Sequence, residues 1–125
     1  MIFGTGLDII EIGRIKKSLA KYSSRFENKI FTDGEINYCQ LQADPGKHFA
    51  ARFAVKEAVS KSLGTGITHE VGFKDIEVVN QTSGKPIVKM GGRGKILFEK
   101  LNLKFIHISI SHDRHYAIAH AIAEQ

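Results

Sequence analysis

Residues 48–63 read HFAARFAVKEAVSKSL, and this stretch decides the fold of the protein. Pro45-Gly46 precedes it and Gly64-Thr65-Gly66 follows it, so we predict a helix over residues 48–63. When successive residues are placed about 100° apart around the helix, the apolar side chains cover most of its circumference. A helix that is apolar nearly all round is largely buried, so this one should lie at the centre of the domain.

The chain before this helix predicts one strand and two further helices. Residues 2–12 are rich in β-branched side chains and are punctuated by glycine, as is typical of a strand. In residues 13–26 the apolar side chains recur every three or four positions, which predicts one helix with a single buried stripe. Thr32 or Asp33 can cap a following helix, with Glu35 in its first turn.

The chain after the long helix predicts mainly strands. Residues 73–79 and 87–90 read as strands that are joined by a turn at 83–86, and residues 95–101 read as an amphipathic helix. The C-terminal part alternates as an antiparallel hairpin does, with one face of small residues: Ala117, Ala119, Ala121 and Ala123. We therefore expect a single α+β domain over residues 1–125, with an antiparallel sheet packed against the long buried helix.

The composition limits the class of protein. The 125 residues carry a net charge of +5, which favours an anionic partner: nucleic acid, a phosphorylated cofactor, anionic lipid or an acidic protein. Cys39 is the only cysteine, which excludes an intrachain disulfide and indicates a reducing compartment. The N-terminus has no signal-peptide pattern, and no apolar run reaches the roughly 20 residues that span a bilayer. We expect a soluble, cytoplasmic protein for which oligomerisation would be a natural way to gain burial.

Two carboxylates need an explanation. Asp8 lies in an apolar strand, where a carboxylate is costly to bury unless it caps the strand end or pairs with a cation such as Arg14. Glu57 and Lys61 are four residues apart on one side of the long helix, as an intrahelical ion pair or as part of a site. If the fold brings Asp8 and Glu57 together, their oxygens suit Mg²⁺, which completes its shell with water and substrate phosphate.

Several cations could bind phosphate. Arg52 and Lys56 lie on another side of the long helix, and Lys47 and His48 lie at its N-terminal end, where free N–H groups bind anions. The alternative is a solvated polar edge of the helix. His112 opens the C-terminal hairpin turn, where it either donates to a phosphate or caps the turn.

Five blocks of sequence occur in an order that resembles the holo-[acyl carrier protein] synthase family, the short bacterial phosphopantetheinyl transferases. The most diagnostic block contains Phe53-Ala54-Val55-Lys56-Glu57-Ala58 with Lys61 following, and the N-terminal block contains Gly6-Leu7-Asp8-Ile9 with Arg14 following. The five blocks are residues 4–14, 31–35, 52–66, 84–86 and 108–112. Residues 40–47 and 90–103 match nothing specific, and residues 113–115 occupy positions at which the family varies, so they are given no role.

The resemblance implies a fold like that of the 4′-phosphopantetheinyl transferases and a reaction. Asp8 and Glu57 would hold Mg²⁺ with the pyrophosphate of coenzyme A, and Lys61 would lie near the reacting phosphate. A serine of apo-acyl carrier protein would accept the phosphopantetheine arm, with release of adenosine 3′,5′-bisphosphate. Glu57, Lys61 and a metal-bound water remain open as the base. The residues assigned to coenzyme A are Arg52, Gly64, Gly66, Lys85, Pro86 and His112, with Lys47 added because of its position at the helix start.

The resemblance also implies partners. Arg14 would contact the carrier protein, and Lys17, Lys21 and Arg25 follow it at helical spacing along one exposed side. The family implies a homotrimer whose three sites lie between neighbouring subunits. The main rival interpretation is a basic nucleic-acid-binding module that uses the same helix, but it leaves Asp8 and Glu57 unexplained. A trimeric scaffold without catalytic activity is a third interpretation, and it predicts no dependence on metal.

Overall fold

The computed structural model describes residues 1–125 and has a layer of sheet over a layer of helices. Three antiparallel strands form the main sheet in the order β1 (Ile2–Glu11), β5 (Tyr116–Glu124) and β4 (Phe105–His112). β2 (Ile76–Asn80) and β3 (Pro86–Met90) form a separate two-stranded hairpin. β1 and β4 are therefore the two edges of the main sheet.

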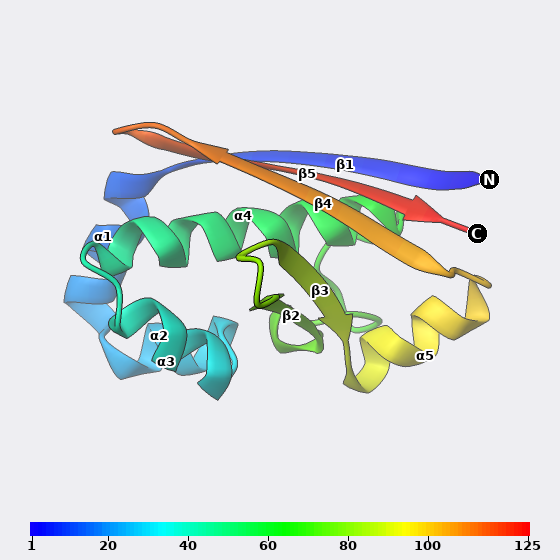
Figure 1. The fold of residues 1–125 in the computed structure, drawn as a ribbon. Helices are drawn as coiled ribbons and strands as arrows, with labels where there is room; N and C mark the ends of the chain where they lie inside the picture. The colour runs from blue at the N-terminus through cyan, green and yellow to red at the C-terminus, as the bar shows by residue number, and fades with distance from the viewer.

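The long helix α4 (Pro45–Ser62) lies along one face of the main sheet (Figure 1). α1 (Ile12–Tyr22), α2 (Ser24–Ile30) and α3 (Asp33–Gln40) gather at one end of α4, and α5 (Gly92–Lys100) lies at the other end. The β2–β3 hairpin covers the side of α4 that faces away from the sheet (Figure 1). The predicted α+β domain with an antiparallel sheet on a central buried helix is confirmed.

Small residues let α4 approach the sheet closely. The four alanines of β5 are buried on its inner face, as the alternation predicted. On β1 a Cβ atom at Gly4 or Gly6 would overlap the carbonyl oxygens of Ser62 and Ala58 in α4. Only glycine fits at these two positions, because the helix backbone occupies the space that a side chain needs.

α4 is buried almost all round, as its composition predicted. Phe49, Val55 and Val59 are almost completely excluded from solvent. Each such side chain contributes roughly 1.5–3 kcal/mol when it is buried rather than exposed. α4 therefore joins two hydrophobic clusters, one against the sheet, α5 and the hairpin, the other against α1, α2 and α3.

Several predicted boundaries are wrong, among them the start of α5, which is Gly92 rather than residue 95. The helix predicted over residues 13–26 is interrupted at Ser23, whose φ of 49° is not helical, so α1 ends there and α2 starts. α4 begins at Pro45 rather than at residue 48, because proline fits the first turn of a helix, where no N–H donor is needed. Phe73–Asp75 forms a turn of 3₁₀-helix ahead of β2 instead of extending the strand. The predicted cap of α3 is confirmed at Thr32, whose side chain accepts a hydrogen bond from the backbone N–H of Glu35.

Candidate active site

Asp8 lies in the middle of the edge strand β1, facing α4, with its side chain largely but not fully buried. Its Oδ1 atom is 3.3 Å from Nζ of Lys61 in α4. Lys61 also donates a hydrogen bond of 2.9 Å to the carbonyl of Leu7. The alternatives that Asp8 pairs with Arg14 and that Lys61 pairs with Glu57 along the helix are therefore wrong, because the ion pair joins β1 to α4.

Glu57 faces the same space as Asp8. Burial raises the pKa of Glu57 above its ordinary value, the Asp8 carboxylate raises it further, and only Lys61 acts in the opposite direction. The two carboxylates thus repel each other across the space between β1 and α4. We call Asp8, Glu57 and Lys61 the acidic half-site.

The two carboxylates of the acidic half-site are oxygen ligands of the kind that Mg²⁺ takes. Mg²⁺ binds through one or two carboxylates and keeps water or phosphate as its other ligands. Nowhere in the structure do three His, Cys, Asp or Glu side chains lie close enough together to hold a metal ion. The repulsion that raises the pKa of Glu57 is what a divalent cation would relieve.

A second group of residues lies on another side of α4. Arg52 is only 4% exposed, and its guanidinium stacks 4.1 Å from the ring centroid of Tyr38 and donates a 2.7 Å hydrogen bond to Oδ1 of Asn80. Its Nε atom is buried without a partner. Burial lowers the pKa of His48, and the positive charges of Arg52, His112 and Lys47 lower it further. We call Arg52, His48, Tyr38 and Asn80 the basic half-site, which is suited to an anion.

The turn that carries Lys85 and Pro86 is tied to the basic half-site. The side chain of Asn80 donates a 3.0 Å hydrogen bond to the carbonyl of Gly84. Lys85 and Pro86 form one wall of a cavity of about 210 Å³, and residues 105–108 of β4 form another. Asn80 thus links Arg52 to the turn with Lys85 and Pro86, while Lys47 and His112 are connected to Arg52 through their effect on the pKa of His48.

The remaining two residues assigned to coenzyme A follow the acidic half-site in the chain. Gly64 and Gly66 form the turn after α4, with φ angles of 84° and 65° that favour glycine. Their backbone N–H groups donate to the carbonyls of Lys61 and Ser60. One chain thus brings Asp8, Glu57 and Lys61 together, but it holds the basic half-site on a different side of α4.

The alternative that Arg52 and Lys56 form a solvated edge of α4 is wrong. Lys56 is completely buried, and its Nζ lies 2.7 Å from Oε1 of Glu35. Residue spacing alone did not identify Tyr38, Asn80 or the contact of Lys56 with Glu35. The only local signal was the pairing of Thr32 with Glu35 at the start of α3, which predicts a helix cap and no partner elsewhere.

The basic stripe on the N-terminal helix is shorter than predicted. Arg14, Lys17 and Lys21 are exposed on α1, but Arg25 belongs to α2, beyond the break at Ser23. Arg25 lines a separate hollow of about 260 Å³ beside the aromatic rings of Tyr22 and Phe26. No single helix therefore carries all four cations.

Fold and half-sites together define a small α+β protein that is suited to holding a divalent cation and phosphate groups. Residues 4–121 match the model of the 4′-phosphopantetheinyl transferase superfamily. This chain belongs to that superfamily, and the resemblance in its sequence blocks is confirmed.

Known relatives match over the whole chain. The holo-[acyl-carrier-protein] synthase of Halothermothrix orenii is 44% identical over 125 residues, which cover 100% of this chain and 99% of the relative. The crystal structure of the synthase from Neisseria meningitidis has a TM-score of 0.94 at 31% identity and full coverage of both chains. The synthase from Bacillus anthracis, in complex with CoA (3′,5′-ADP), has a TM-score of 0.84 at 39% identity, covering 100% of this chain and 98% of that one.

Proposed function

We propose that this protein is a holo-[acyl carrier protein] synthase. It transfers the 4′-phosphopantetheine group from coenzyme A to a serine of apo-acyl carrier protein and releases adenosine 3′,5′-bisphosphate. The observation that carries the proposal is the meeting of Asp8, Glu57 and Lys61 across β1 and α4. The similar synthase from Helicobacter pylori, matched over 96% of this chain, is known in complex with coenzyme A.

Asp8 and Glu57 would hold Mg²⁺, and Lys61 would bind the phosphate that is transferred. When bound, Mg²⁺ polarises the pyrophosphate and stabilises the charge of the leaving group. The Lys61 ammonium group, half-exposed and held at β1 by Leu7 and Asp8, can approach the same phosphate and stabilise charge there. While Lys61 is an ammonium group, the proton of the serine hydroxyl passes to Glu57 or to water; Lys61 could accept it only as a neutral amine, and it would not then stabilise the phosphate charge.

The position of the two half-sites supports an assembly of several copies. The phosphates of one coenzyme A need both the acidic and the basic half-site, which one chain keeps on different sides of α4. A neighbouring copy can supply the missing half. The outer face of the main sheet exposes apolar side chains, with Leu7 at 60% and Ile9 at 59%, as a subunit interface would require. The assembly that we propose is a homotrimer with its three sites between subunits.

The exposed cations of α1 suit the second substrate. Carrier proteins are typically acidic near the modified serine, so Arg14, Lys17 and Lys21 would steer and orient the encounter, with Arg25 beside them on α2.

None of the helices has the length and apolar character that a membrane span requires. We place the reaction in the cytoplasm, where fatty acids are assembled on carrier proteins.

A mass measurement tests the proposal. The protein is incubated with coenzyme A, Mg²⁺ and apo-acyl carrier protein, and the carrier should gain the mass of one phosphopantetheine group. Excess chelator should prevent the gain. An unmodified carrier, together with tight binding of RNA or DNA by this protein, would favour the nucleic-acid-binding module. A trimer with no metal-dependent transfer would favour the scaffold.

A further inference from the structure

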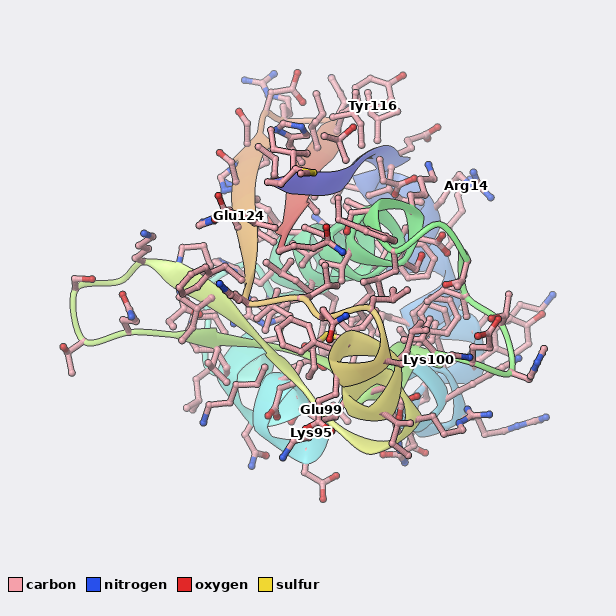
Figure 2. The ribbon with its side chains drawn as sticks, turned by 90° about the vertical axis from the view of Figure 1, so that its right-hand side faces the viewer. Arg14, Lys95, Glu99, Lys100, Tyr116 and Glu124 are labelled. Carbon is pink, nitrogen blue, oxygen red and sulfur yellow. The ribbon has the colours of Figure 1, made fainter.

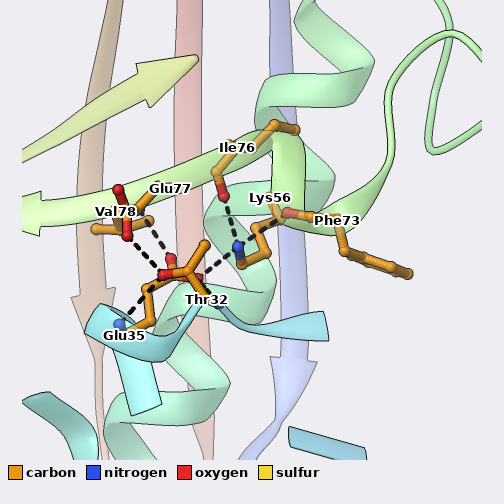
Figure 3. Close-up of polar contacts among 7 residues, drawn as sticks. All are labelled: Thr32, Glu35, Lys56, Phe73, Ile76, Glu77 and Val78. Atoms are coloured by element: carbon orange, nitrogen blue, oxygen red, sulfur yellow. Dashed lines mark hydrogen bonds and ion pairs between the residues drawn. The ribbon is translucent and has the colours of Figure 1, made fainter. Parts of the chain in front are cut away.

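β2 contacts the helices through every second residue of the strand. Ile76 and Val78 are buried, and Asn80, which ends the strand, is exposed but lies on the same face of the hairpin by the alternation of a strand. Each of the three makes a polar contact with a charged side chain from a helix. Figure 3 shows two of these contacts, at Ile76 and Val78.

The first contact is made by Lys56 of α4. Its ammonium group donates hydrogen bonds to the carbonyl of Phe73, at 2.9 Å, and to the carbonyl of Ile76. The same group pairs with Glu35 at 2.7 Å, and neither side chain is exposed to solvent. Lys56 thus fastens the start of β2 to α4 while its charge is balanced by α3 (Figure 3).

The second contact is made by Glu35 of α3. One carboxylate oxygen accepts a 2.8 Å hydrogen bond from the backbone N–H of Val78, and the other accepts one of 2.9 Å from the backbone N–H of Thr32. The Thr32 hydroxyl donates a 2.6 Å hydrogen bond to Glu77, which is also in β2. Glu35 therefore links α3, α4 and the middle of β2 at one point.

The third contact belongs to the basic half-site. Arg52 is one helical turn before Lys56 on α4, and its hydrogen bond to Asn80 fastens the end of β2. The side chain of Asn80 also donates a hydrogen bond to the carbonyl of Gly84, which precedes Lys85 and Pro86. The position of this turn relative to Arg52 thus depends on how β2 lies on α4.

We propose that Lys56 and Glu35 are positioning residues for the coenzyme A half of the site. They fix β2 on α4, so that Arg52, Lys85 and Pro86 are held in the arrangement that binds coenzyme A. This role deepens the proposed function and rests on it. Neither residue touches the substrate in this arrangement, because Lys56 and Glu35 are enclosed by protein.

The hairpin needs such fixation because it is not part of the main sheet. β2 pairs only with β3, and two strands alone are marginally stable in water. Apolar packing of Ile76 and Val78 holds the hairpin against the core, but it is less directional than hydrogen bonds to charged groups. The acidic half-site is formed by β1 and another side of α4, so it does not depend on these contacts.

Substitution of Lys56 separates positioning from mere stability. Lys56→Met keeps most of the side-chain volume but removes the ammonium group. The double variant Lys56→Met/Glu35→Gln leaves no charge buried without its partner, so it retains more folded protein. Loss of folded molecules lowers the maximal velocity in proportion but leaves the Michaelis constants unchanged. Misplacement of Arg52 and Lys85 instead weakens the binding of coenzyme A by each folded molecule.

We expect the dissociation constant for coenzyme A, measured by calorimetry on the folded fraction, to rise about tenfold or more in both variants. The turnover number per folded molecule at saturating coenzyme A, and the Michaelis constant for carrier protein, should stay within about twofold. Ile15→Ala is the control, because it opens a cavity in the other hydrophobic cluster, which contains no residue of β2, and should lower stability without changing the affinity for coenzyme A.

Two results would overturn the inference, and they differ in what else they overturn. If the wild-type protein neither binds coenzyme A nor modifies the carrier, the proposed function is wrong and the positioning role is wrong with it. If the wild type binds coenzyme A and both Lys56 variants bind it equally well, only the positioning role is wrong. The Lys56–Glu35 pair would then serve stability alone.

Discussion

At the scale of single residues, Glu57 is placed where its charge is unfavourable to the folded protein, because burial and the neighbouring Asp8 carboxylate both raise its pKa. β1 and α4 bring the two carboxylates together, and Lys61 is their only close cation. Two carboxylates that repel each other are retained where function requires them, because substitutions that remove the repulsion generally stabilise a protein at the expense of activity.

Removal of either carboxylate should therefore separate activity from stability. We expect Asp8→Ala and Glu57→Ala each to reduce transfer by more than about a hundredfold, because each deletes one of only two protein ligands for Mg²⁺. Glu57→Gln should unfold at an equal or higher temperature than the wild type in the absence of metal. Glu99→Ala, an exposed carboxylate on α5 in Figure 2, is the control and should retain full activity. Full activity of the wild type in excess chelator would contradict the role of both residues.

The raised pKa of Glu57 predicts how pH acts on metal binding. In the metal-free protein the folded state holds the Glu57 proton to a higher pH than the ordinary value of 4.5. The stability from this proton is complete below pH 4.5 and is lost as pH rises through the raised pKa. Mg²⁺ needs the ionised form, so the increase in melting temperature on adding Mg²⁺ should be large at pH 8. It should fall as pH drops through the raised pKa of Glu57.

Calorimetric melting with and without Mg²⁺ at a series of pH values measures this effect. Glu57→Gln cannot titrate at this position, so its response to Mg²⁺ should be weak at every pH. An equal response of the wild type at pH 8 and below pH 4.5, the ordinary pKa of a glutamate, is the outcome that excludes Glu57 as a ligand.

At the scale of elements, the contact between β1 and α4 creates the acidic half-site. This contact is possible because Gly6 of β1 has no side chain. Gly6→Ala places a methyl group against the carbonyl of Ala58, so β1 must move away from α4. We expect a loss of stability of about 1–3 kcal/mol or more, as for overpacked cores, and a loss of activity that exceeds it because Asp8 moves with the strand. Denaturant unfolding and transfer assays measure the two effects. Gly91→Ala is the comparison, since nothing surrounds that position and its φ of −134° suits any residue.

α1 presents its cations away from the core, so charge reversal there should act on one substrate only. Arg14→Glu should raise the Michaelis constant for carrier protein about tenfold and leave that for coenzyme A unchanged, because like charges then face each other across the interface. Wild-type transfer should slow as salt rises, since exposed charges are screened within about 10 Å at 0.1 M. Lys100→Glu changes charge equally at the far end of the molecule, where Figure 2 shows it on α5, and serves as the control. An equal rise in both Michaelis constants in Arg14→Glu would mean that Arg14 holds Asp8 in place rather than contacting the carrier protein.

At the scale of the whole molecule, the separation of the half-sites makes complementation possible. Glu57→Ala lacks a working acidic half-site and Arg52→Ala lacks a working basic one, so each variant alone should be nearly inactive. If each site combines the two halves from neighbouring subunits, mixed trimers regain sites in which both halves are intact.

Equal amounts of the two variants, unfolded and refolded together, should recover about a quarter of wild-type activity, because each half is intact with a probability of about one half. Sedimentation equilibrium on the same sample should report the trimer. A mixture that stays as inactive as its components would show that each site is built within one chain.

The sequence by itself determined the architecture of this protein. Residues 48–63 predicted a buried helix, and the alanines of β5 predicted a small-residue face. Both predictions are local, because side chains return to the same face every 3.6 residues in a helix and every 2 residues in a strand. Asp8, Glu57 and Lys61 were identified as one site before any contact between them was known, through the resemblance of their sequence blocks.

Only the tertiary structure decided which charges are buried and which parts of the site one chain can assemble. Arg52 and Lys56 look like a polar edge of α4, but Asn80 and Glu35, which lie 28 and 21 residues away in the chain, enclose them. The break at Ser23 and the separation of the two half-sites are likewise invisible in local periodicity. The physical reason is that a charged side chain is buried only where distant partners satisfy it, and the fold alone brings those partners together.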